Sequence, residues 1–406
     1  MLRQDVRMGY GFLRVGHVAL SDLEFGPPPE FLAVFLDSMY RRRTSGEPYR
    51  DVIHELVGEG PIIADRLDAL GYTPARAMEV LDELLDAARA RDWSDGPARD
   101  PRITEAFSSA DWFPIIQAEL AAGERPWHPD EPAWDLGIGY FLSDQAQPYM
   151  MRLLLLADPQ LPVRLDFTKA MYEWERDEPD ALCADALTSL RSTGATYAPT
   201  VVLTEGSSDV SVLQSALKLL YPHLVDLVRF MDFGERPPGG AGPLVSLVRG
   251  FAAAGIANRV IALFDNDSAA TEALSKLDQA TLPDNIRVRQ YPRLDLAANY
   301  PALGPPTLTH PSGWLATADV NGLACSIELY LGRDVLTGPD GALVPVQWTS
   351  YLAGPRQYQG AIAEKRAVHE RFRAKAAAAS TDPAVMAGQD WSGLQAIIHT
   401  ILHAFD

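Results

Sequence analysis

Acidic side chains gather at three places in the second half of the chain. Glu205 and Asp209 come just after one short apolar run, Asp265 and Asp267 come just after another, and Glu328 lies in an apolar segment further on. Short runs rich in β-branched residues are typical of buried parallel strands, and open α/β sheets bind ligands at the carboxyl ends of their strands. Carboxylates gathered there repel one another unless a hard cation such as Mg²⁺, Mn²⁺ or Ca²⁺ neutralises them. The pattern therefore predicts a divalent-metal site.

A metal held by these carboxylates would polarise a phosphodiester, activate water and stabilise the leaving oxygen. We expect Glu205 to be a metal ligand and a candidate general base, and the other four carboxylates to share the metal or metals. Lys365, on a predicted C-terminal helix, would offset the negative charge that develops in the transition state. The predicted activity is a Mg²⁺- or Mn²⁺-dependent phosphodiesterase that acts on DNA or RNA.

Each of these residues also has a structural interpretation when it is taken alone. Asp209 could simply cap a helix, and the aspartates on either side of Asn266 could simply form a turn. Glu328 could pair with Arg333, and Lys365 could be an ordinary surface lysine. The metal site is favoured because the acidic residues occur together, in order, and next to predicted strands.

The residues from Thr200 onward alternate between strand and helix patterns, which predicts an α/β fold with a mostly parallel sheet and helices on both faces. The predicted strands span 200–204, 227–231, 259–264 and 286–290, and the predicted helices span 207–221, 243–254 and 268–278. A proline-rich segment at 300–306 is predicted to be a loop, and a C-terminal helix is expected over about 360–379.

The residues before Gly194 predict a mixed α+β domain. The expected elements are a hairpin within 9–20, helices at 51–57, 74–89, 113–121 and 179–191, and a strand at 163–167. We therefore predict two domains, an N-terminal one over 1–195 and a metal-binding one over 196–406. The first domain could recognise a viral signal, restrain the nuclease or make a homo-oligomer, and no residue in it chooses among these roles.

The composition is that of a soluble globular protein. The 406 residues are 47% hydrophobic and 22% charged, and no apolar run approaches the roughly 20 residues that span a bilayer. The first residues have no apolar core of the signal-peptide type, and the two cysteines form no zinc or disulfide pattern. A cytoplasmic protein without a membrane partner is predicted. The net charge of −19 argues against a simple nucleic-acid binder. It does not exclude one, because the local electrostatic field at a binding site matters more for binding than the net charge of the chain.

The acidic motifs resemble those of Toprim domains, the metal-binding fold of topoisomerases, primases and several nucleases. Glu205-Gly206 is similar to the Toprim catalytic glutamate motif, and Asp265-Asn266-Asp267 is similar to its paired aspartates. Asp209 matches the acidic position that nuclease versions place just after the glutamate. A longer stretch, from Asp319 through Lys365, resembles the Toprim half of proteins described as HEPN/Toprim-associated. The N-terminal segment 66–73 also resembles the leading domain of that group.

The resemblance implies a metal-dependent nuclease and an antiviral defence effector. In Toprim nucleases of the OLD type, the glutamate, the acidic residue after it and the paired aspartates bind metal. A later glutamate and a lysine complete that site, and by similarity Glu328 and Lys365 fill those positions here.

Two departures from the relatives affect what is expected. OLD-type relatives carry an ATPase domain, but this sequence contains no Gly-x-x-x-x-Gly-Lys-Ser/Thr loop, so any nucleotide control would come from a partner protein or activator. The arginine–histidine gaps at Arg50–His54, Arg14–His17 and Arg125–His128 are shorter than a HEPN ribonuclease motif needs. The alternative to a nuclease is a catalytically silent, metal-braced Toprim scaffold or sensor that regulates a partner.

Overall fold

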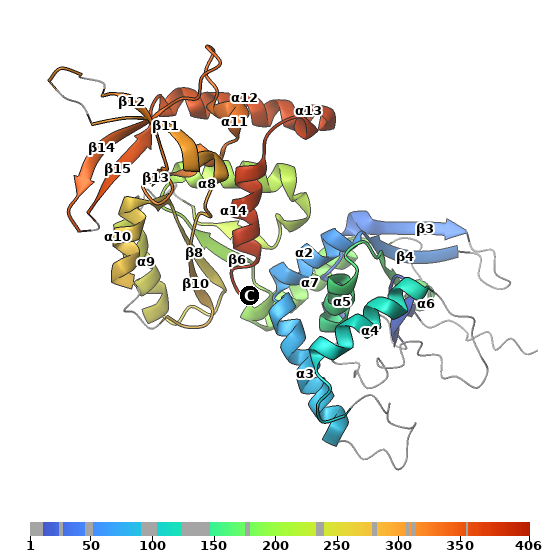
Figure 1. Ribbon diagram of the computed structural model, residues 1–406. Coiled ribbons are helices and arrows are strands. Elements are labelled where there is room, and N and C mark those ends of the chain that lie inside the picture. The colour runs from blue at the N-terminus through green and yellow to red at the C-terminus, as the bar shows by residue number, and fades with distance from the viewer. Residues whose placement is uncertain are drawn as a thin grey trace, which may run out of the picture. The chain divides into compact units, whose positions relative to one another are not determined.

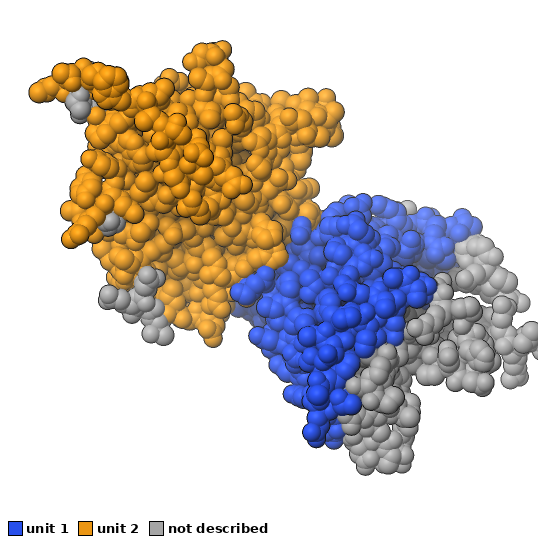
Figure 2. Space-filling model, viewed as in Figure 1, with its two compact units in different colours: residues 1–197, 406 blue, residues 198–405 orange. Residues whose placement is uncertain are grey.

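The computed structural model divides the chain into two compact units, residues 1–197 with residue 406, and residues 198–405 (Figure 2). It describes residues 11–23, 27–44, 52–90, 104–123, 147–174, 179–232, 239–277, 282–305, 308–310, 313–354 and 356–406. Among these residues, no helix combines the length and the apolar character that crossing a membrane requires.

The N-terminal unit contains a five-stranded sheet in the order β2-β1-β5-β4-β3, with every neighbouring pair antiparallel. Its strands are β1 (Gly11–Val15), β2 (Val18–Leu23), β3 (Tyr40–Thr44), β4 (Val52–Gly58) and β5 (Val163–Asp166). The paired strands β1 and β2 form a hairpin in the region where the sequence predicts one.

The helices of the N-terminal unit are α1 (Pro29–Leu32), α2 (Gly60–Leu70), α3 (Pro74–Ala90), α4 (Ser109–Ala122), α5 (Gln147–Ala157), α6 (Thr168–Glu173) and α7 (Leu182–Thr193) (Figure 1). A buried ion pair joins α2 to α5. The Arg152 guanidinium donates two hydrogen bonds to the Asp68 carboxylate, at 2.6 and 3.0 Å, and both side chains are almost fully buried. Such a two-pronged pair fixes the orientation of both helices.

The helix predicted at 51–57 is wrong, because this segment is strand β4. β4 lies between β5 and β3 in the sheet, and its residues are buried without the alternation that marks a half-exposed strand. The buried polar residues have partners: His54 Nδ1 is 2.8 Å from the Tyr40 hydroxyl oxygen, and Glu55 accepts a hydrogen bond from Arg43 at 2.9 Å. Pairing on both edges therefore overrides the helical spacing of the apolar residues.

The C-terminal unit is built on a four-stranded parallel sheet in the order β10-β8-β6-β7 (Figure 1). Its strands are β6 (Thr200–Leu203), β7 (Val228–Phe230), β8 (Val260–Phe264) and β10 (Ile286–Gln290), and the helices between them are α8 (Ser207–Leu220), α9 (Ala241–Ala253) and α10 (Ser268–Leu277). The α/β fold with a parallel sheet and intervening helices agrees with the sequence-based expectation.

The strand order reverses direction between β6 and β8. The chain passes from β6 to β7 on one side and then crosses back to β8 on the other side. α9 and α10 pack together over one face, where Leu244, Val248 and Ala273 join the core of β6 and β8. α8 instead contacts the late helices α12 (Lys365–Thr381) and α14 (Ser392–Leu402). A reversal of this kind leaves a crevice outside the carboxyl ends of the two central strands.

The remaining residues add strands that cover this edge. A second sheet in the order β12-β11-β14-β15 consists of β11 (Tyr300–Leu303), β12 (Leu315–Ala318), β14 (Val346–Leu352) and β15 (Gln357–Ile362), and β13 (Ala324–Cys325) pairs with β9 (Asn266–Asp267). The loop predicted at 300–306 is therefore partly wrong, since β11 occupies its first half. The C-terminal helix begins at Lys365, because the preceding residues up to Ile362 belong to β15.

Candidate metal centre

Glu205 and Asp265 meet at the carboxyl edge of the parallel sheet. Glu205 follows β6 by two residues, Asp265 follows β8 directly, and these strands are neighbours in parallel register. The backbone N–H of Asp265 donates a hydrogen bond to Glu205 Oε1 at 3.0 Å. Two acidic residues that lie sixty positions apart in sequence are thereby joined at the point where the strand order reverses.

Asp209 has a structural role in the first turn of α8. Its Oδ2 accepts the backbone N–H of Gly206 at 2.9 Å, and the residue is only 5% exposed. An acidic residue is also stabilised by the dipole at the N-terminus of a helix. The same placement turns Asp209 back toward the end of β6. The capping role is therefore compatible with the predicted role as a site residue.

The carboxylates of this edge affect one another's ionisation. Burial, followed by repulsion from Asp267 and Asp209, raises the pKa of Glu205 to about 7. Burial and the charge of Glu328 raise the pKa of Asp209 to about 6. The pKa of Asp265 is raised well above its ordinary value by burial and by all four neighbouring carboxylates. The group thus behaves as one electrostatic cluster, which a cation would stabilise in its ionised form.

Asp265 also has an oxygen atom without a partner. The residue as a whole is partly exposed, but its Oδ1 is closed off from solvent and has no hydrogen-bond partner within the described residues. A buried oxygen of this kind is uncommon and calls for a ligand or a structural explanation.

Asp267 differs from its neighbour because protein donors already bind both of its oxygens. Oδ1 accepts the backbone N–H of Ala270 at 2.8 Å, which caps α10, and Oδ2 accepts a hydrogen bond from Gln359 Nε2 at 2.6 Å. Each oxygen keeps a second lone pair, so Asp267 could bind a cation only from the sides that these two donors leave open.

Glu328 lies in a short 3₁₀ helix (Ile327–Tyr330), whereas the sequence suggested an apolar helix, and it is fully buried among donors. Its Oε1 is 2.8 Å from Lys365 Nζ and 2.7 Å from His369 Nε2, and its Oε2 accepts a hydrogen bond from Ser326 Oγ at 2.6 Å. Burial alone would raise the pKa of Glu328, but the His369 hydrogen bond and the Lys365 charge outweigh burial and lower it to about 2. The pairing with Arg333 that the sequence left open is not found among the contacts of the described residues.

Lys365 is held at the cluster through this pair. The ammonium group is half-exposed, and the charges of Glu328, Asp209 and Asp265 raise its pKa although burial acts in the opposite direction. Its positive charge therefore faces the acidic edge of the sheet.

Sequence reasoning missed two residues of this region, His369 and Tyr291. His369 lies four positions after Lys365, a spacing that places both on one face of α12 and could have been noticed. Tyr291 follows β10 directly, just as Asp265 follows β8. Its proximity to the cluster depends on the order of the strands, which its own surroundings in the sequence do not reveal.

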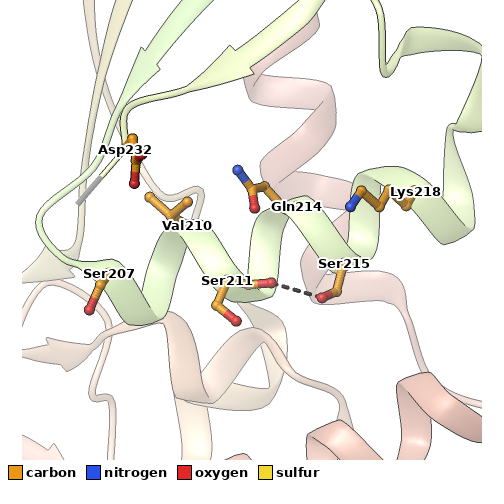
Figure 3. Close-up of a pocket in the computed structure, with 7 residues that line it drawn as sticks. All are labelled: Ser207, Val210, Ser211, Gln214, Ser215, Lys218 and Asp232. Atoms are coloured by element: carbon orange, nitrogen blue, oxygen red, sulfur yellow. Dashed lines mark hydrogen bonds between the residues drawn. The ribbon is translucent and has the colours of Figure 1, made fainter. Parts of the chain in front are cut away.

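A separate polar pocket of ≈ 430 Å³ runs along α8. Figure 3 shows its lining residues, from Ser207 at the start of the helix to Lys218 near its end, with the Ser215 hydroxyl donating to the Ser211 carbonyl oxygen at 2.8 Å. None of the predicted site residues lines this pocket, although Ser207 is only two residues from Glu205. The pocket is thus a neighbour of the acidic cluster and not part of it.

The chemistry of the cluster fits a hard divalent cation. Glu205, Asp209 and Asp265 offer carboxylate oxygens, and the buried Oδ1 of Asp265 lacks a partner that a cation would supply. Among the described residues, no three acidic, histidine or cysteine side chains already lie close enough together to hold an ion.

No protein-family model matches the chain, and neither a curated protein nor a solved structure does.

Proposed function

We propose that the C-terminal unit is a Toprim-type nuclease that uses Mg²⁺ or Mn²⁺ to cleave phosphodiester bonds of DNA or RNA. The observation that carries the proposal is the hydrogen bond between the Asp265 backbone and the Glu205 carboxylate at the carboxyl ends of β6 and β8. Together with Asp209, these residues form a partly buried acidic cluster with raised pKa values, which is typical of functional sites.

The residues of the cluster have different roles in this proposal. Glu205, Asp209 and Asp265 would hold the cation, which supplies Lewis-acid activation of the phosphate when it is bound. Asp267 holds the start of α10 and the Gln359 side chain, and it would join the ligands through a lone pair that these donors leave open. Glu328 holds Lys365 and His369 in place, and the Lys365 ammonium stabilises negative charge on the phosphate.

A cleavage assay tests this function. Purified protein would be incubated with plasmid, single-stranded DNA and total RNA, in Mg²⁺, Mn²⁺ or EDTA. The wild type should cleave in metal but not in EDTA, and Glu205→Ala should lose the activity while remaining folded. Glu370→Ala is the matched control, because Glu370 is exposed on α12 and pairs with Arg366 on the helix surface. Cleavage that survives in Glu205→Ala would rule out this site.

The second candidate function is a metal-braced scaffold or sensor that regulates a partner protein. The protein donors that occupy Asp267 and Glu328 favour it, because they stabilise the edge of the sheet without any ligand. Since the sequence has no ATPase loop, any nucleotide control would come from a partner or be absent in either case. Mn²⁺ binding without cleavage, even with candidate partners added, would support the scaffold. The resemblance to defence proteins adds the expectation that the nuclease is an antiviral effector.

A further inference from the structure

Tyr291 lies beside the acidic cluster with an unsatisfied hydroxyl group. The residue is only 3% exposed, and its hydroxyl oxygen has no hydrogen-bond partner in the part of the chain that the structure describes. Its backbone N–H donates to the carbonyl oxygen of Phe264, the last residue of β8, at 2.9 Å. Asp265 is the residue that follows Phe264. Tyr291 and Asp265 therefore leave neighbouring strands at the same edge of the sheet.

The ring of Tyr291 is held in position by Tyr330. The two ring centroids are 5.2 Å apart, and the ring planes are inclined by 60°. Tyr330 is itself fixed, because its hydroxyl donates to the Pro292 carbonyl oxygen at 2.6 Å and accepts a hydrogen bond from Asn266 at 3.3 Å. Tyr330 thus has the ordinary partners of a buried tyrosine, whereas Tyr291 has none.

The hydroxyl of Tyr291 lies in the electric field of the whole cluster. Burial first, and then the charges of four carboxylates, raise its pKa well above the ordinary value. The four are Asp209, Asp265, Glu205 and Glu328. The hydroxyl group therefore keeps its proton and is available as a hydrogen-bond donor.

An unsatisfied donor and an unsatisfied acceptor thus occur in one small region. The acceptor is Asp265 Oδ1, and the two atoms are not hydrogen bonded to each other. Burying polar atoms without partners is unfavourable, and buried waters satisfy such groups where two or more polar partners face the same space. We propose that Tyr291 and Asp265 Oδ1 together hold one water molecule at the acidic cluster, with Tyr291 as the positioning residue.

The use of this water in catalysis rests on the proposed nuclease function. The water oxygen forms the new bond to phosphorus, and the bond from phosphorus to the leaving ester oxygen breaks. The water releases one proton to solvent, and the leaving oxygen takes up a proton from solvent. Tyr291 donates its hydrogen bond to the water oxygen throughout and is not consumed.

Crystal structures of the wild type and of Tyr291→Phe test the water site directly. In the wild type, an ordered water should lie within hydrogen-bond distance of both the Tyr291 hydroxyl and Asp265 Oδ1, and in the variant it should be lost or displaced. A wild-type structure without this water, or with the Tyr291 hydroxyl bonded to a protein atom, would overturn the proposal. This result does not depend on whether the protein cleaves nucleic acid.

Kinetics test the role of the water. Loss of an outer hydrogen bond of this type typically costs about 10- to 100-fold in activity, so we expect Tyr291→Phe to lower kcat by that factor while KM and the Mn²⁺ Kd stay within about twofold. Tyr351→Phe, at a tyrosine that is 55% exposed, is the matched control and should cleave like the wild type. An unchanged kcat in Tyr291→Phe would refute the positioning role. If the wild type cleaves nothing even with candidate partners added, the proposed function fails, and the crystal structures still decide the water site.

Discussion

Replacing Glu205 by Gln should stabilise the metal-free protein at alkaline pH. The substitution keeps the shape of the side chain and an oxygen that can accept the Asp265 backbone N–H, but it removes one charge from the acidic cluster. A buried carboxylate among other carboxylates opposes folding, and an amide in the same position does not.

The size of the effect follows from the pKa of Glu205. The rise from 4.5 to about 7, at about 1.36 kcal/mol for each pKa unit, gives a cost of ~3 kcal/mol for the ionised residue in the folded state. For a unit of the size of residues 198–405, this corresponds to a rise of roughly 6–12 °C in the unfolding temperature of the variant.

Because folding raises the pKa of Glu205, the stability of the wild type must fall as the pH rises. Below pH 4.5 the carboxyl group is protonated in both states, and the cost is absent. Between pH 4.5 and about 7 the unfolded chain releases its proton first, so the stability of the wild type falls as the pH rises. Above about pH 7 the full cost is present. The free energy of unfolding of Glu205→Gln should therefore exceed that of the wild type by a large amount at pH 8 and by only ~1 kcal/mol at pH 5.

Thermal unfolding in EDTA at pH 5 and pH 8 measures this difference. Glu370→Gln serves as the control, since it removes a charge from an exposed residue and should change the unfolding temperature little at either pH. If Glu205→Gln unfolds at or below the temperature of the wild type at pH 8, Glu205 is not strained by its acidic neighbours, and the electrostatic account of the cluster is wrong.

Three other outcomes are expected. Mn²⁺ should raise the unfolding temperature of the wild type more at pH 8 than at pH 5, because protons compete for Glu205 and Asp209; an equal rise would point to binding elsewhere. Lys365→Met should reduce the cleavage rate by roughly 10²–10³, measured by single-turnover assays, while Lys276→Met, at an exposed lysine on α10, should not. Arg152→Met should destabilise the N-terminal unit by ~3–5 kcal/mol in urea unfolding, because the buried Asp68 carboxylate then loses the Arg152 guanidinium. An unchanged midpoint would argue against the ion pair.

The α/β fold of the C-terminal unit was predictable because its strands are short, apolar and separated by helices of regular length. A fully buried strand such as Val260–Phe264 has only one interpretation in that context. The strand at 52–58 was not predictable in the same way. Its residues are covered on both faces, so the alternation that would have distinguished it from a helix is absent.

In the candidate site too, some contacts could be predicted from the sequence and others could not. The meeting of Glu205 and Asp265 follows from the rule that strand ends share an edge, which a sequence pattern can express. The donors around Glu328 do not follow from any local pattern, because Lys365 and His369 reach it from a helix some forty residues later. The unsatisfied hydroxyl of Tyr291 depends on which strands become neighbours, and only the folded chain determines that.

The hydrogen bond from Asp265 to Glu205 has a consequence for the kinetics of folding. It closes a loop of sixty residues that contains β7, α8 and α9, so the entropy of that loop must be lost before the bond can form. We expect contacts of such long range to form late and to be largely absent from the transition state. A cation bound across them would therefore slow the unfolding reaction while leaving the folding rate almost unchanged. The cation would therefore stabilise the folded state without stabilising the transition state for folding.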